Sequence, residues 1–253
     1  MPSPSADELT IATTDIANSL DLVSQVIKQC ADRIRNNNPY DLQSALQIML
    51  QTADTPGCKI VFTGVGKSYL IGKKLAATLT SVGTPAISLH STEALHGDLG
   101  IIHPGDCVVA LSYSGATEEV LRLASVLHGV RSKEEASVDW GNTAGGAYLN
   151  NSHSVRLVGM GKSAESPLGK MCDAWIESAV EMELSPLVNA PTSSSSLMLA
   201  IGDAIAIMMM KRRHFGPVDF ARNHPGGHLG VVSREIARQQ ELEDELRNIG
   251  HLG

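Results

Sequence analysis

Two short loops rich in glycine and hydroxyl groups carry the residue types best suited to chemistry. Residues 64–68, Gly-Val-Gly-Lys-Ser, directly follow the apolar run 59–63, and residues 112–117, Ser-Tyr-Ser-Gly-Ala-Thr, directly follow the apolar run 107–111. Each pattern predicts a strand, a tight turn and the start of a helix, which points backbone N–H groups and hydroxyls at an anion. Two such loops predict one phosphorylated ligand held between them.

The first loop completes neither of two nucleotide-binding motifs. A Walker A loop requires Gly where Val61 stands, and the dinucleotide fingerprint requires a third Gly where Tyr69 stands. The alternative is that both loops are ordinary tight turns that bind no ligand. The four hydroxyl side chains within residues 112–117 exceed what a turn needs, and they favour the ligand-binding interpretation.

Composition narrows the class of protein. The 253 residues are 43% hydrophobic but only 4% aromatic, which predicts a sizeable, mostly aliphatic core. The net charge of −7, without a long basic stripe, argues against a nucleic-acid partner. No signal-peptide pattern and no uninterrupted stretch of about 18 apolar residues is found, so no membrane partner is expected. The four scattered cysteines contain no C-x-x-C pair, which favours a reducing cytoplasmic location.

The hydrophobic periodicity predicts an α/β fold. Two amphipathic helices, 9–35 and 41–51, come first. Strands then alternate with helices: strands at 59–63, 85–90, 106–111, 154–159 and 175–182, and helices at 68–82, 116–128, 163–172 and 195–213. This alternation predicts a three-layer αβα sandwich with a five-stranded parallel sheet. In the flavodoxin-like order 2-1-3-4-5, the first and third strands are neighbours at the switch point, where such sheets bind ligands.

We expect residues 1–253 to form a single domain. It comprises N-terminal helices at 9–51, an α/β core at 58–230 and a helical tail at 231–253. Residues 131–153 are charged and then Gly/Asn-rich, which predicts a flexible surface insertion. The apolar stripes of the first and last core helices exceed what one domain buries, so a homo-oligomer, a dimer or a tetramer, is expected.

Three further segments accompany the loops: residues 84–100 with the string E-A-L-H-G-D-L-G, residues 191–194, and residues 219–230 with H-P-G-G-H-L-G. From about Ile60 to Gly230 the chain resembles the SIS (sugar isomerase) domain and, within it, is similar to the D-arabinose-5-phosphate isomerases. The resemblance implies a five-stranded parallel sheet and a small sugar phosphate as ligand. Bacterial relatives commonly carry a C-terminal pair of CBS domains, which this sequence does not contain.

The resemblance also implies roles for individual residues. Phosphate binding falls on the two loops, at Gly66, Ser68, Ser112, Ser114, Gly115 and Thr117. Catalysis falls on Lys67, Glu119, Glu183, His224 and His96. Relatives place active-site residues across subunits, so His96 or His224 would act in trans. The chain departs from the family pattern at Tyr113 and Ala116, where Asn and Glu are usual, and at Met182, where Lys is usual.

These residue types suit aldose–ketose isomerisation without a cofactor. A carboxylate removes the proton beside a carbonyl to give a cis-enediol, and a cation or donor stabilises the charge on oxygen. The main alternative is a non-catalytic, regulatory protein that binds a sugar phosphate, and a weaker one is a lyase or aminosugar isomerase. Glu119 could merely complement a helix dipole. The histidines lack zinc-site spacing, so no metal is expected.

Overall fold

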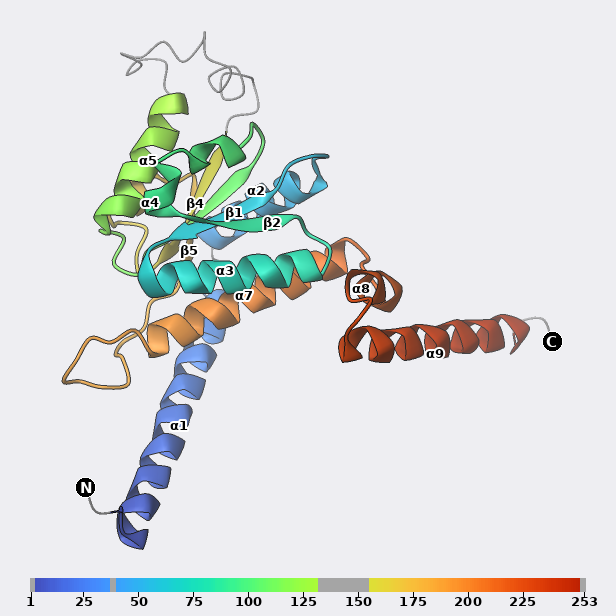
Figure 1. Ribbon diagram of the computed structural model, residues 1–253, viewed down its shortest axis with the longest axis horizontal. Helices are drawn as coiled ribbons and strands as arrows, with labels where there is room; N and C mark the ends of the chain where they lie inside the picture. Colours follow the sequence, from blue (N-terminus) through green and yellow to red (C-terminus); the bar gives the residue numbers. More distant parts are fainter. Residues whose placement is uncertain (1–2, 37–39, 132–154, 251–253) are drawn as a thin grey trace.

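The computed structural model describes residues 3–36, 40–131 and 155–250 (Figure 1). A sheet of five parallel strands lies at its centre: β1 (Ile60–Gly64), β2 (Ala86–His90), β3 (Cys107–Leu111), β4 (Arg156–Gly161) and β5 (Ala174–Glu177). The strand order is β2-β1-β3-β4-β5. The predicted order and the parallel direction of every strand are therefore confirmed.

Helices cover both faces of the sheet (Figure 1). One face carries α2 (Tyr40–Asp54), α3 (Gly66–Ser81) and α7 (Ser193–Arg212), and the other carries α4 (Ser91–Ala94) and α5 (Glu118–Arg131). Alternate residues of each strand point to opposite faces, so Ile60 and Phe62 join the core under α3 and α7 while Val61 joins the core under α5. Burial on both faces explains why β1 and β3 are continuous apolar runs.

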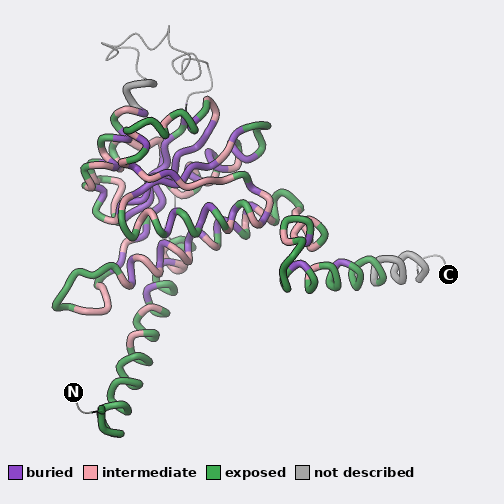
Figure 2. Tube along the Cα trace, in the orientation of Figure 1, coloured by how far each residue is buried: buried purple, intermediate pink, exposed green. Residues whose placement is uncertain are grey.

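The two ends of the chain form helices that extend beyond this core (Figures 1 and 2). Helix α1 (Ala6–Asn36) packs on α7, and its only buried residues are Val26 and Cys30. At the other end, α8 (Pro217–Asn223) precedes α9 (His228–Gly250), which starts three residues before the expected tail. The sequence analysis missed α8, which starts at Pro217 and is capped by the Asp219 carboxylate bound to the backbone N–H of Gly216 at 3.1 Å.

Two predicted elements were wrong. Residues 163–172 form turns and a short 3₁₀ helix, η3 (Gly169–Met171), because the hydroxyls of Ser163 and Ser166 bind nearby backbone N–H groups and Pro167 interrupts the segment. The strand predicted at 175–182 ends at Glu177, because its neighbour β4 ends at Gly161. The segment predicted as an insertion, 131–153, lies outside the described residues after Arg131.

Helix α7 is the most apolar helix of the core. Among the described residues it alone is long and apolar enough to match a membrane-crossing helix by length and composition, but half of it is buried inside the protein. It packs against α3 and α1, and Lys74 of α3 forms an ion pair with Asp203. These contacts identify it as a core helix of the sandwich.

A buried carboxylate joins the amino ends of the two central strands. Asp106, which directly precedes β3, is fully buried. It accepts hydrogen bonds from Lys59 Nζ at 2.7 Å, from the backbone N–H of Lys59 at 2.9 Å and from that of His103 at 2.8 Å. Because Lys59 directly precedes β1, this carboxylate fixes β1 and β3 against each other.

We predict that Asp106→Ala lowers the free energy of unfolding by about 3 kcal/mol, because it leaves a largely buried ammonium without its partner. Urea denaturation measures the change. The control is Asp32→Ala, which removes an exposed carboxylate that binds Lys28 and Arg35, and its effect should be much smaller. Equal losses in the two variants would contradict this role for Asp106.

Candidate active site

The two loops start side by side at the carboxyl edge of the sheet. Strands β1 and β3 are neighbours, with Thr63 opposite Ala110. A Cβ atom on Gly64 would lie only 3.1 Å from the carbonyl oxygen of Leu111, so the strand ends are in close contact. Loop 64–68 leads into α3 on one face and loop 112–117 leads into α5 on the other. This is the switch point that the strand order predicted.

The first loop leaves the N-terminus of α3 without a side-chain cap. Val65 occupies the N-cap position and makes no capping hydrogen bond. Gly66 adopts a φ of 56°, a conformation that favours glycine. Lys67 is exposed and Ser68 is half-buried. The first backbone N–H groups of α3, together with these two side chains, can therefore receive an anion.

Hydrogen bonds within the second loop hold its shape. The Ser112 hydroxyl is buried, lies 2.9 Å from that of Thr117 and accepts the backbone N–H of Gly115 at 3.1 Å. Gly115 has a φ of 65°, and a Cβ atom there would lie 2.1 Å from Ser166 Oγ. Ser114 is exposed, and among the described residues it accepts one hydrogen bond, from the N–H of Ala116 at 3.2 Å. Ser114 is therefore the loop hydroxyl most open to a ligand.

Glu183 is bound to the N-terminus of α7. Its carboxylate accepts hydrogen bonds from the backbone N–H and hydroxyl of Thr192, at 2.8 and 3.0 Å, and from those of Ser194, at 3.2 and 2.5 Å. Partial burial raises the pKa of Glu183, but the hydrogen bonds from Ser194 and Thr192 together outweigh it, so the pKa lies below its ordinary value. Glu183 is therefore an ionised cap of this helix.

Tyr113 joins the second loop to the segment that carries Glu183. Its hydroxyl lies 3.3 Å from the backbone nitrogen of Val180 and 3.4 Å from the carbonyl oxygen of Val180. Burial, reinforced by the negative charge of Glu183, raises the pKa of Tyr113. The sequence analysis noted this residue as one of the loop hydroxyls and as a departure from the family, without this contact. No local signal could have revealed a contact between residues 67 positions apart.

The segment after β2 lies at the same edge. His90 contacts Tyr69 edge to face, with ring centroids 4.9 Å apart, and Ser91 Oγ lies 2.9 Å from Thr63 Oγ1. The helix that follows, α4, packs on α5. His96 comes just after α4 and is exposed. This arrangement brings the strand ends of β1, β2 and β3 together around Lys67 and the two loops.

Glu119 follows the second loop in the first turn of α5. Its side chain is half-buried, and none of the hydrogen bonds among the described residues involves it. The preceding residue, Glu118, is exposed and forms an ion pair with Arg122 at 2.5 Å. The two neighbouring carboxylates therefore have different surroundings.

His224 lies at the opposite end of α3 from Lys67. Its ring stacks on Phe220, with Nδ1 2.8 Å from the Phe220 carbonyl oxygen and Nε2 3.2 Å from Ser81 Oγ. Lys67 and Ser81 are the second and last residues of α3, so about 21 Å of helix separates them. One chain alone therefore brings together every predicted site segment except the one that carries His224.

Comparison with known proteins decides the family. The SIS domain model matches residues 56–131, which include both loops. The arabinose 5-phosphate isomerase KpsF of Escherichia coli is 41% identical over 175 residues, covering 68% of this chain and 48% of KpsF. A solved Escherichia coli CFT073 structure in complex with arabinose 5-phosphate is 30% identical with a TM-score of 0.66, covering 84% of this chain and 98% of that one. The chain belongs to the SIS domain family.

Another similar protein is also named arabinose 5-phosphate isomerase. The arabinose 5-phosphate isomerase KdsD of Pseudomonas aeruginosa is 39% identical over 172 residues, covering 68% of this SIS chain and 46% of KdsD. The chain spans about half the length of the curated relatives it matches. Within the described residues of this SIS chain, no group of three or more His, Cys, Asp or Glu side chains is arranged to hold a metal ion.

We predict that the stabilising effect of Glu183 depends on pH. Because its pKa is lowered in the folded SIS chain, its contribution is complete above the ordinary value near 4.5 and is lost as the pH falls through the folded value. The difference in free energy of unfolding between wild type and Glu183→Gln, measured in urea, should shrink between pH 7 and pH 3. Glu181→Gln, an exposed neighbour, is the control. A constant difference across this range would contradict the cap.

Proposed function

We propose that this chain catalyses aldose–ketose isomerisation of a sugar phosphate and interconverts D-arabinose 5-phosphate and D-ribulose 5-phosphate. The observation that carries the proposal is the meeting of an uncapped helix N-terminus, a hydroxyl-rich loop and two carboxylates at one sheet edge. Support comes from relatives named arabinose 5-phosphate isomerase and from the related structure in complex with arabinose 5-phosphate.

The substrate phosphate binds at the N-terminus of α3. The N-terminus of α7 already receives the Glu183 carboxylate, whereas no side chain caps α3. A phosphate bound at α3 lies near Gly66 and Ser68 of the first loop and near Ser114 of the second loop. The hydrogen bond between Ser112 and Thr117 keeps the second loop in position to bind it. Fixing the phosphate orients the reacting carbons of the sugar.

Glu119 transfers the proton in this mechanism. It removes the proton from the carbon beside the carbonyl, and the electron pair of that C–H bond forms the cis-enediol. The proton is then delivered to the former carbonyl carbon. The hydroxyl proton of the other carbon moves to the former carbonyl oxygen, and that other carbon becomes the new carbonyl. No electrons leave the substrate, so the reaction needs no cofactor. Lys67 stabilises the negative charge that develops on oxygen.

Glu183 has a different role from Glu119. Its four hydrogen bonds hold it ionised and reduce its basicity, which makes it a weak base near neutral pH. Its negative charge helps to position the loop around Tyr113 and the sugar rather than to accept the first proton. His96, at the same edge and exposed, is placed to bind sugar hydroxyls.

His224 acts in the site of another subunit. Within one chain its distance from Lys67 exceeds any side-chain reach, so a catalytic His224 requires a homo-oligomer. Exposed apolar residues on α1 and α9 provide surfaces for such assembly.

The isomerase is tested with ribulose 5-phosphate in D₂O, followed by NMR. The wild type should produce arabinose 5-phosphate and incorporate deuterium beside the carbonyl. We predict that Glu119→Gln lowers kcat about 100-fold or more with little change in KM, because it keeps the shape but removes the base. Glu118→Gln, one residue earlier, is the matched control and should retain activity. A wild type without turnover or exchange would favour the sugar-phosphate sensor.

The trans role of His224 is tested by mixing two inactive variants, Glu119→Gln and His224→Asn. If each site combines Glu119 of one chain with His224 of another, each mixed dimer contains one intact site, so about a quarter of the wild-type activity returns after subunit exchange. A mixture of Glu119→Gln with Lys67→Ala is the control, because both residues belong to the same chain's half of the site. It should regain no activity. Equal behaviour of the two mixtures would contradict the trans role.

A further inference from the structure

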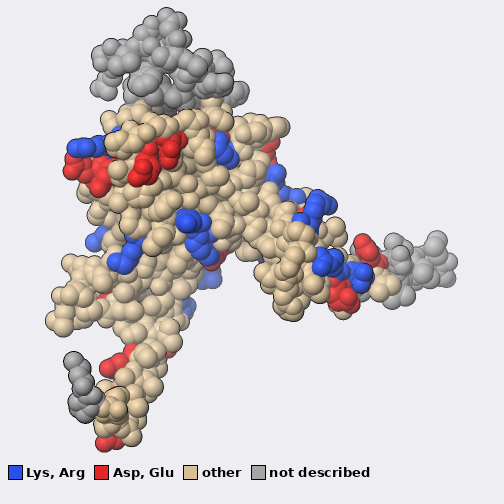
Figure 3. All heavy atoms as spheres, in the orientation of Figure 1, with Lys and Arg blue, Asp and Glu red and all other residues tan. Residues whose placement is uncertain are grey.

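The proposed isomerase brings two negative charges to one edge of the sheet. A phosphate at the N-terminus of α3 and the Glu183 carboxylate repel each other, most strongly where water is excluded. Figure 3 shows basic side chains over α3, which attract the phosphate, and acidic side chains over α4 and α5. Glu183 must therefore be held in place against the ligand that binds at the same edge.

Segment 178–183 leads from β5 to Glu183 without helix or strand. Its first residue, Ser178, is buried and donates its backbone N–H to the carbonyl oxygen of Gly161 at 2.8 Å, which continues the pairing of β5 with β4. Its last residue, Glu183, is bound to the N-terminus of α7. The contacts of the residues between them decide where the segment lies relative to the second loop.

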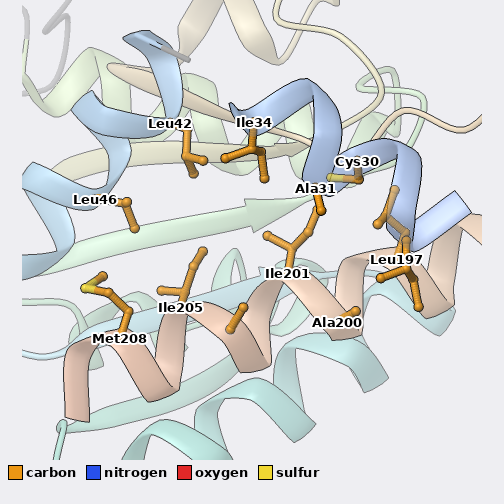
Figure 4. Close-up of a pocket in the computed structure, with 12 residues that line it drawn as sticks. Cys30, Ala31, Ile34, Leu42, Leu46, Leu197, Ala200, Ile201, Ile205 and Met208 are labelled. Carbon is orange, nitrogen blue, oxygen red and sulfur yellow. The ribbon is translucent and has the colours of Figure 1, made fainter. Parts of the chain in front are cut away.

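Arg33 of α1 holds this segment from one side. Its guanidinium donates a hydrogen bond to the carbonyl oxygen of Ala179 at 2.8 Å, and its Nε lies 3.4 Å from a carboxylate oxygen of Glu177. This part of α1 is fixed in turn, because Ala31 of α1 and Ile201 of α7 line the same apolar groove (Figure 4). Arg33 therefore anchors the start of the segment to α1.

Tyr113 of the second loop holds the next residue of the segment. Its side chain packs against the core under α3 and α7, to which the buried Val180 also belongs. Its hydroxyl lies 3.3 Å from the backbone nitrogen of Val180 and 3.4 Å from the carbonyl oxygen, so it can accept from the first and donate to the second. Among the hydrogen bonds of the described residues, these alone join the second loop to segment 178–183.

Tyr113 stands between the two serines of the second loop. Ser112 is buried, whereas Ser114 is exposed. The carbonyl oxygen of Tyr113 accepts the backbone N–H of Lys162, which directly follows β4, at 2.8 Å. The backbone of Tyr113 is thus fixed to the sheet beside the ligand-binding hydroxyls, and its side chain carries that position across to segment 178–183.

The Tyr113 hydroxyl keeps its proton at neutral pH. Burial raises the pKa of Tyr113, the hydrogen bond with Val180 opposes this, and the negative charge of Glu183 raises the pKa further. The neutral phenol retains a donor for the carbonyl oxygen of Val180. The charge of Glu183 therefore favours the form of Tyr113 that can make both hydrogen bonds.

We propose that Tyr113 is a positioning residue of the isomerase: its hydroxyl holds segment 178–183 against the second loop, so that Glu183 keeps its place when the substrate phosphate binds. The inference rests on the proposed function and adds a residue to it. Arg33 and Tyr113 both hold the segment, but only Tyr113 ties it to the loop that receives the ligand. Tyr113 acts through Val180 rather than on the reacting carbons.

Hydrogen exchange tests this link without turnover. Inorganic phosphate should leave the exchange of a peptide covering 178–183 unchanged in the wild type and accelerate it in Tyr113→Phe, because repulsion then displaces the released segment. Tyr69→Phe, which removes the same atom from the ring that contacts His90, is the matched control and should behave as the wild type. Circular dichroism should show that both variants remain folded. If phosphate does not change the exchange in Tyr113→Phe, the inference is wrong.

Kinetics test the consequence for the site. Tyr113→Phe should lower kcat about fivefold to tenfold, the rate equivalent of one lost hydrogen bond, with KM nearly unchanged because the phosphate-binding groups are intact. In a Glu183→Gln background the same change should cost no further rate, since the segment then carries no charge to hold. Additive losses, or a wild-type kcat in Tyr113→Phe, would contradict the positioning role. A wild type without turnover but with the expected hydrogen exchange would support the link and reject only the isomerase activity.

Discussion

The parallel pairing of β1 with β3 is the constraint on which the candidate site depends. Because these neighbouring strands run in the same direction and lead to helices on opposite faces, their following loops diverge from one point at the sheet edge. The buried Asp106 carboxylate fixes the amino ends of the pair, and the close approach of Gly64 to Leu111 fixes the carboxyl ends. The loops can therefore be short and still face a common ligand.

The N-termini of α7 and α3, which lie at this edge, differ in how they are capped. That of α7 is neutralised within the chain, since Glu183 satisfies the backbone N–H groups of Thr192 and Ser194. That of α3 has no side-chain cap and begins with a glycine in a left-handed conformation. A helix N-terminus left without a protein anion favours a ligand anion, so of the two it is that of α3 that can receive one.

Two features of the chain lie apart from the candidate site. His224 is bound at the far end of α3, through Ser81 and Phe220, and the N-terminal half of α1 carries apolar residues that stay exposed among the described residues. Helix α1 extends from the core, and His224 lies at the opposite end of α3 from Lys67.

The sequence by itself determined the parts of this protein that depend on local patterns. The apolar runs of β1 and β3, the glycine and hydroxyl residues that follow them and the period of α1 are all properties of neighbouring residues, so these strands, loops and this helix could be predicted. Prediction failed at residues 163–172, where the hydroxyls of Ser163 and Ser166 compete with helix formation. Only the tertiary structure decided the contact of Tyr113 with Val180, the capping of α7 by Glu183 and the separation of His224 from Lys67. These depend on how far-apart segments pack, and hydrogen bonds between such segments leave no periodic signal in the sequence.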